Sequence, residues 1–141
     1  MKTVIPILIV LLAVGVWLPV MNTPVAVVAQ SSQWVAPAWA DTLLNPVKNN
    51  PGASEAGKKI FNQLCAICHG SSGKGDGVAG MALNPRPANL ISKAVQKQSD
   101  GALYWKITTG RPPMASYRES LTEEQRWQVV NYIRQLAEKT K

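Results

Sequence analysis

The sequence predicts an all-α protein, and three observations indicate this class. Apolar residues recur at helical spacing in the segment that begins near Ser54 and in the segment that follows Thr122. No segment alternates apolar and polar residues convincingly, as a half-buried strand would. Glycines and prolines between the helical segments predict loops. A length of 141 residues suits about one domain.

The N-terminal segment is typical of an export signal. The positive pair Met1-Lys2 precedes residues 4–20, which are almost purely apolar. Cleavage is expected after Ala29 and could fall as late as Ala40, because a small residue stands at both positions. The alternative is an uncleaved membrane anchor, although residues 4–20 as a helix would span only about 25 Å, slightly less than a hydrocarbon core. Both interpretations place the domain outside the cytoplasmic membrane, in the periplasm or its equivalent.

The sequence therefore divides into three predicted parts. Residues 1–29 form the signal or anchor, residues 30–53 a linker, and residues 54–141 the folded domain. The linker contains several prolines and no clear period, so we expect little fixed structure in it.

Four helices are expected in the domain. The first opens at Ser54 as its N-cap and carries Ile60, Leu64 and Ile67 at helical spacing. A short helix covers residues 90–97, and another runs from the cap candidate Asp100 to a stop at Gly110. The last helix opens with a capping box of Thr122 and Gln125. Its apolar stripe consists of Val129, Tyr132, Ile133 and Leu136.

The stretch Cys65-Ala66-Ile67-Cys68-His69 is the most informative motif, because this spacing is a signature of c-type haem attachment. Two cysteines three residues apart lie on the same side of a helical turn, so their sulfurs can form thioethers with the two vinyl groups of one haem. The adjoining His69 can then bind the iron. A zinc site would need a further Cys or His cluster, and a thioredoxin-type redox pair would need a βαβ pattern. The sequence offers neither.

Beyond this motif, the chain resembles the class I c-type cytochromes over residues 54–136. Gly57 and Phe61 match the N-terminal helix of that family, and Trp127, Val129 and Tyr132 match its C-terminal helix. The resemblance implies that the two terminal helices cross, with short helices and loops around one haem c. It further implies that Gly57 lets the helix backbones approach and that Phe61 packs on Val129 and Tyr132. The local sequences of residues 75–77, 85–90 and 110–114 look like those of small bacterial monohaem members.

The second axial ligand is predicted to be Met114. The chain contains one histidine, so two histidines of this molecule cannot ligate the iron. Met81 is within reach, but two prolines precede Met114 and limit the entropy of its loop. The family resemblance also places the axial methionine after such a proline segment. Met81 is then a flexible apolar filler.

Further residues are expected to surround the haem. The resemblance implies that the His69 ring donates Nδ1–H to a carbonyl of Pro85 or Pro87. Arg86 and Trp105 are candidates for hydrogen bonds to the haem propionates. The expected ring contacts are Leu83, Leu90, Leu103, Ile107 and Tyr117.

These features predict a single-electron carrier that is not itself an enzyme, because His/Met ligation leaves no open iron position. The alternatives are a membrane-anchored relay subunit of a respiratory complex, and a peroxidase or gas sensor in which Met114 is labile. The formal net charge of +7 would favour an acidic redox partner. Nucleic-acid binding is not expected, since the chain has no basic run. Cations that could frame the haem edge are Lys58, Lys59, Lys74, Lys93, Lys97, Lys106, Arg111 and Arg118.

Overall fold

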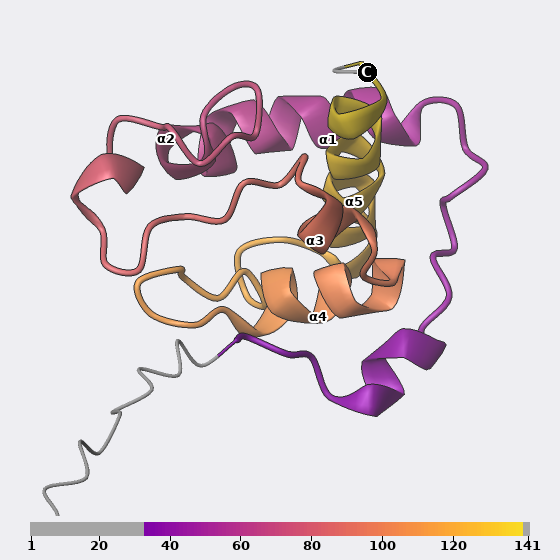
Figure 1. The fold of residues 1–141 in the computed structure, drawn as a ribbon. Coiled ribbons are helices and arrows are strands. Elements are labelled where there is room, and N and C mark those ends of the chain that lie inside the picture. The colour runs from indigo at the N-terminus through magenta and orange to yellow at the C-terminus, as the bar shows by residue number, and fades with distance from the viewer. Residues whose placement is uncertain (1–32, 140–141) are drawn as a thin grey trace, which may run out of the picture. The chain divides into compact units, whose positions relative to one another are not determined.

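The regular structure of the described residues, 33–139 of a computed structural model, is helical apart from one isolated bridge between Arg111 and Met114 (Figure 1). This confirms the all-α class. The α-helices are α1 (Ala53–Ile60), α2 (Ala66–His69), α3 (Lys93–Gln96), α4 (Asp100–Thr109) and α5 (Glu123–Glu138). Two 3-10 helices, Ala38–Thr42 and Gly80–Ala82, and a π-helical turn, Phe61–Cys65, complete the regular structure.

The first and last α-helices cross, as the resemblance implied (Figure 1). Gly57 is buried at the crossing, where α1 passes directly over the backbone of α5. One turn further along, the fully buried Phe61 ring makes an edge-on contact with Tyr132, with 5.2 Å between ring centroids. Val129 and Val130 are also fully buried beside them. The core therefore depends on contacts between residues about seventy positions apart.

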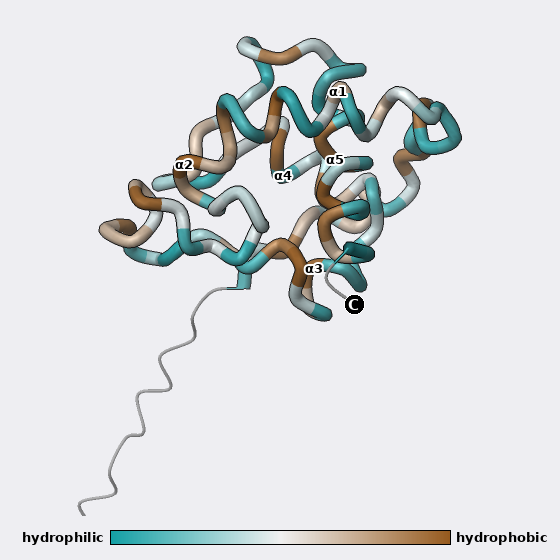
Figure 2. The backbone as a smooth tube through the Cα atoms, turned by 90° about the horizontal axis from the view of Figure 1, so that it is seen from above, coloured by the Kyte–Doolittle hydropathy of each residue, from teal (hydrophilic) through white to brown (hydrophobic). Residues whose placement is uncertain are grey.

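Helix α5 forms as its sequence predicts. Thr122 and Gln125 make the reciprocal bonds of a capping box, which satisfies backbone donors of the first turn. The expected apolar stripe is buried along its whole length. Figure 2 shows hydrophobic and hydrophilic stretches alternating along this helix, the pattern of a helix with one face in the core.

The start of the first helix differs from the prediction. Helix α1 begins at Ala53, one residue before Ser54, and its N-cap position, Gly52, makes no side-chain cap bond. Instead, the Asn50 side chain accepts from Gly52 N at 2.9 Å and the Asn50 carbonyl accepts from Ala53 N at 3.0 Å. An Asn turn ahead of the helix thus takes the part expected of a serine cap.

The two middle helices keep their predicted places, and α4 has a different cap from the predicted one. Helix α3 spans only Lys93–Gln96 within the expected 90–97, and Ser92 caps it. Helix α4 begins at Asp100, but the cap is Ser99, whose Oγ accepts from Ala102 N at 2.9 Å. Asp100 instead forms a partly buried salt bridge with Arg134 of α5, at 2.8 Å.

Residues 34–52, called the strap below, have more fixed structure than the sequence predicted. They belong to the same compact unit as the rest of the domain and run beneath α4 before they rise to α1 (Figure 1). The strap contains the 3-10 helix and the fully buried Ala40. Besides local turns, its side chains bond to residues of α4 and α5, as Asn45 does to Asp100 and Asn131, and such long-range bonds leave no trace in the local sequence pattern.

The predicted signal or anchor, residues 1–29, lies outside the described residues. Within residues 33–139, no helix has both the length and the hydrophobicity needed to cross a bilayer.

Candidate cofactor site

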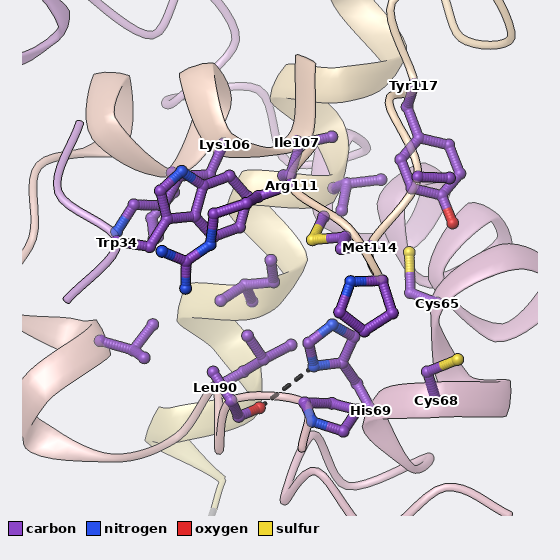
Figure 3. Close-up of a pocket in the computed structure, with 18 of the residues that line it drawn as sticks. Trp34, Cys65, Cys68, His69, Leu90, Lys106, Ile107, Arg111, Met114 and Tyr117 are labelled. Atoms are coloured by element: carbon purple, nitrogen blue, oxygen red, sulfur yellow. Dashed lines mark hydrogen bonds between the residues drawn. The ribbon is translucent and has the colours of Figure 1, made fainter. Parts of the chain in front are cut away.

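A cavity of about 480 Å³ lies between α2, α4 and the loops after α2 and α4. Its walls are mainly apolar. The predicted ring contacts Leu83, Leu90, Leu103, Ile107 and Tyr117 all line it, together with the predicted site residues Cys65, Cys68, His69, Arg86 and Met114. The structure thus brings residues from separate parts of the chain to one pocket (Figure 3).

The two cysteines occupy one side of this pocket (Figure 3). Cys65 ends the π-helical turn and Cys68 lies in α2, and both thiols are free. Burial, with a smaller contribution from Cys68, raises the pKa of the Cys65 thiol to about 12. At neutral pH this thiol is therefore protonated, and in the folded chain it is a poor nucleophile.

His69 ends α2 and points into the same pocket (Figure 3). Its Nδ1 lies 3.1 Å from the carbonyl oxygen of Ala88, not from a carbonyl of Pro85 or Pro87 as expected. Since a carbonyl can only accept, Nδ1 carries the proton and Nε2 keeps a free lone pair. Burial lowers the pKa of His69, although the bond to Ala88 opposes this shift. The ring is thus a neutral imidazole, the form that binds metal ions.

Met114 reaches the pocket from the loop that follows α4 (Figure 3). Reciprocal backbone bonds to Arg111, of 2.8 and 3.1 Å, hold its own backbone. Beyond it, Ser116 Oγ donates to Thr108 O at 2.7 Å and Tyr117 N donates to Ile107 O at 3.1 Å. Met81, the other candidate ligand, is 59% exposed and does not line the pocket. Loop geometry therefore favours Met114.

A buried cation fixes the far end of this loop. Arg126 of α5 donates through Nη1 to the carbonyls of Arg118 and Leu121, at 2.9 and 2.5 Å, and more weakly to that of Tyr117. Its Nη2 donates to the hydroxyl of Tyr104 at 3.0 Å. Sequence reasoning did not single out Arg126, because an arginine early in an amphipathic helix is usually on its polar face.

The opposite side of the pocket is aromatic and cationic, and sequence reasoning missed its central residue. Trp34 of the strap lines the pocket, and the Lys106 ammonium and Arg111 guanidinium lie 5.6 and 5.2 Å from its ring centroid (Figure 3). Trp105 does not line the pocket; its ring packs on that of Trp34, with 6.3 Å between centroids. Burial, and secondarily Arg111, lowers the pKa of Lys106. Arg86 lines the pocket but is exposed.

The donor atoms of this pocket fit a haem. They are one imidazole nitrogen, one thioether sulfur and two thiols, which suit thioether formation and soft axial ligation of iron. The apolar side chains of Leu64 and Ile67 line the pocket yet are 38% and 54% exposed, so a flat apolar group would cover surface that is otherwise wet. This also explains why these two residues, placed on the apolar face by their spacing, are not in the protein core.

Comparison with known proteins extends this assignment. Residues 52–133 match the protein family described as cytochrome C oxidase, cbb3-type, subunit III. A cytochrome c6 of Leptolyngbya boryana is 32% identical over 85 residues, which are 60% of this chain and 93% of that protein. Among solved structures, a chain of the reducing HAO-like protein complex of Kuenenia stuttgartiensis gives a TM-score of 0.55 at 26% identity. That likeness covers 67% of this chain and 49% of the other, about half its length.

Proposed function

Because this chain belongs to the c-type cytochrome family, with a domain of the cbb3-type subunit III kind, we propose that it moves single electrons between redox proteins outside the cytoplasmic membrane. A haem-based electron carrier is the function common to the family. The finer statements concern the axial ligands, the compartment and the partners. The arrangement of His69 and Met114 about one pocket, beside Cys65 and Cys68, is the observation that supports the ligand assignment.

The chain's own residues have distinct roles in this proposal. Cys65 and Cys68 would hold the haem through two thioethers, and His69 and Met114 would ligate its iron. The bound haem would supply one-electron redox chemistry between two partner proteins. The Ala88 carbonyl orients the His69 ring by accepting a hydrogen bond from its Nδ1–H. A thioether ligand such as that of Met114 favours the reduced state of a haem iron.

This proposed ligand set also implies that the protein is not itself an enzyme. Oxygen, peroxide or a substrate needs an open axial position, and His69 with Met114 leaves none. The loop that carries Met114 is bonded on both sides of the methionine, at Arg111 and at Ser116. This pinning argues against a labile methionine and hence against a peroxidase or gas sensor.

The test uses the protein matured with c-type haem attachment machinery, as wild type, Met114→Ala and Met81→Ala. Wild type and Met81→Ala should keep the haem in acidified organic solvent and show the far-red sulfur–iron band. Met114→Ala should keep the haem, lose the band and bind carbon monoxide when reduced. A band lost in Met81→Ala instead would reassign the ligand, and a pigment that washes out would overturn covalent attachment.

The proposed compartment follows from the apolar segment of residues 4–20. We propose that cleavage follows Ala29 and not Ala40, since Ala40 and the residues before it back to Trp34 are part of the fold. Without residues 1–29, which contain Lys2, the chain keeps 14 Lys and Arg and eight Asp and Glu, and this net charge of +6 supports an acidic docking surface on the partner. A membrane-anchored relay would use the same domain with residues 4–20 retained.

A further inference from the structure

Trp34 lies at the pocket although it precedes the family match, which begins at residue 52. Two cations of the domain, Lys106 and Arg111, lie over the indole ring. The ring also packs against Trp105. A cation this close to an indole ring is attracted to the ring face, and more strongly when it is partly desolvated. Trp34 therefore belongs to a defined aromatic and cationic wall and is not part of a free tail.

The strap is attached to the domain at several points behind Trp34. Ser99 Oγ donates to Asp41 Oδ1 at 2.5 Å. Asn45 Nδ2 donates to Asn131 Oδ1 at 2.7 Å, and Asn131 Nδ2 donates to the carbonyl of Val47 at 2.9 Å. These bonds reach both α4 and α5, so the strap has a fixed course. The position of Trp34 is thus determined by the folded domain.

The wall concentrates positive charge. Lys106 and Arg111 approach the same indole, and like charges held together destabilise one another unless an anion lies nearby. The Lys106 ammonium donates to the neutral amide oxygen of Gln98, at 2.5 Å, and not to a carboxylate. An anionic group within the pocket would offset this repulsion.

The haem supplies such anions on the required side. Its vinyl groups and its propionate carboxylates occupy opposite edges of the porphyrin. Figure 3 shows Cys65 and Cys68 on one side of the pocket and Trp34, Lys106 and Arg111 on the other. Attachment through the cysteines would therefore turn the carboxylates toward the cationic wall.

We propose that Trp34 is a haem-binding residue contributed by the strap, which closes the carboxylate edge of the pocket and holds Lys106 and Arg111 against it. This inference rests on the proposed function, because it requires a covalent haem. Two cations and the exclusion of water at this edge both favour the reduced haem, which carries one positive charge fewer. Trp34 should therefore raise the reduction potential.

The experiment compares the matured wild type with Trp34→Ala and with Trp39→Ala, a matched control in the same segment whose side chain is 56% exposed. Midpoint potential is the readout, with acid extraction and the far-red band as checks on the haem. Trp34→Ala should lower the potential and leave haem attachment and the band intact, whereas Trp39→Ala should change none of them. An unchanged potential in Trp34→Ala overturns the inference, while loss of covalent haem in the wild type overturns the proposed function instead.

Two milder variants distinguish the exclusion of water by Trp34 from its hold on the two cations. They also replace Trp34→Ala if that variant does not fold. Trp34→Phe keeps an aromatic face for the cations and should stay close to wild type. Trp34→Leu keeps only apolar volume and should lower the potential. Lys106→Gln should then lower the potential more in the wild type than in Trp34→Leu, since the two residues act together. Equal potentials in the Phe and Leu variants, or equal effects of Lys106→Gln in both backgrounds, would show that Trp34 does not hold the cations.

Discussion

A β-carbon at position 57 would lie 1.9 Å from the carbonyl oxygen of Gln128, so the absence of a side chain at Gly57 sets the distance between α1 and α5. The same crossing places Phe61 against Tyr132 and aligns α1 with the turn that leads to Cys65. One glycine therefore supports both the core and the placement of the haem attachment motif.

Gly57→Ala should destabilise the domain strongly. The obstructing atoms belong to the α5 backbone and cannot rotate away, so the helices must separate, at a cost of about 1–3 kcal/mol or more. Denaturant unfolding of the matured protein measures this. Gly52→Ala is the control, because its nearest neighbour, Asn50 Oδ1, would be at an ordinary 3.5 Å. Equal stabilities of the two variants would contradict the close packing at residue 57.

Arg126→Met should loosen the ligand loop. The substitution removes donors from the carbonyls of Arg118 and Leu121, and each buried acceptor left unsatisfied costs roughly 1–3 kcal/mol. We expect a lower free energy of unfolding and carbon monoxide binding by the reduced variant, which the wild type should not show. In Arg118→Met, whose side chain is exposed, both properties should stay as in the wild type. A carbon monoxide-resistant Arg126→Met would mean that this residue does not hold Met114 in place.

Gly101→Ala should detach the strap although Gly101 itself does not line the pocket. Its β-carbon would lie 1.9 Å from the carbonyl oxygen of Ala40, so the strap must move. The helix itself should gain about 0.5–1 kcal/mol from the change, since alanine favours helix over glycine. Limited proteolysis should cut the strap faster, and the midpoint potential should fall as in Trp34→Ala. Thr109→Ala, at the exposed end of α4, should do neither. If the strap is cut faster while the midpoint potential is unchanged, docking of the strap does not influence the potential of the haem.

The mature protein should begin after Ala29 and retain Trp34. Intact-mass measurement of the exported, haem-loaded chain distinguishes cleavage after Ala29, cleavage after Ala40 and no cleavage. Cleavage after Ala40 would remove Trp34 and divide the 3-10 helix Ala38–Thr42. A chain that starts at Asp41 would therefore contradict the proposed processing, and an uncleaved chain in the membrane fraction would support the anchored relay.

The helices and the haem motif were predictable because their signals are local. The capping box at Thr122 and the stripe along α5 follow from spacing within one helix. The cap of α4 is Ser99 and not the predicted Asp100, since both are good cap residues and only geometry selects between them. The predicted carbonyl partners of His69 were Pro85 and Pro87, whereas the structure has Ala88, the residue after Pro87.

The strap was not predictable, for a physical reason. It has no hydrophobic period, and its bonds join residues far apart in the sequence, such as Asn45 and Asn131. Its close contact with α4 depends on Gly101 having no side chain. In the sequence, a glycine at this position indicates only a less stable helix. For the same reason Trp105, inside a recognisable helix, was chosen as the pocket tryptophan in place of Trp34.

The crossing of the first and last helices also fixes an order of events during biosynthesis. Because α1 packs on α5, the core cannot close until α5 has been made and delivered. In the closed domain burial raises the pKa of the Cys65 thiol to about 12, whereas in the open chain this thiol is not buried. Cys65 is therefore more reactive toward the cofactor before α5 docks on α1, and the helix crossing sets when that interval ends.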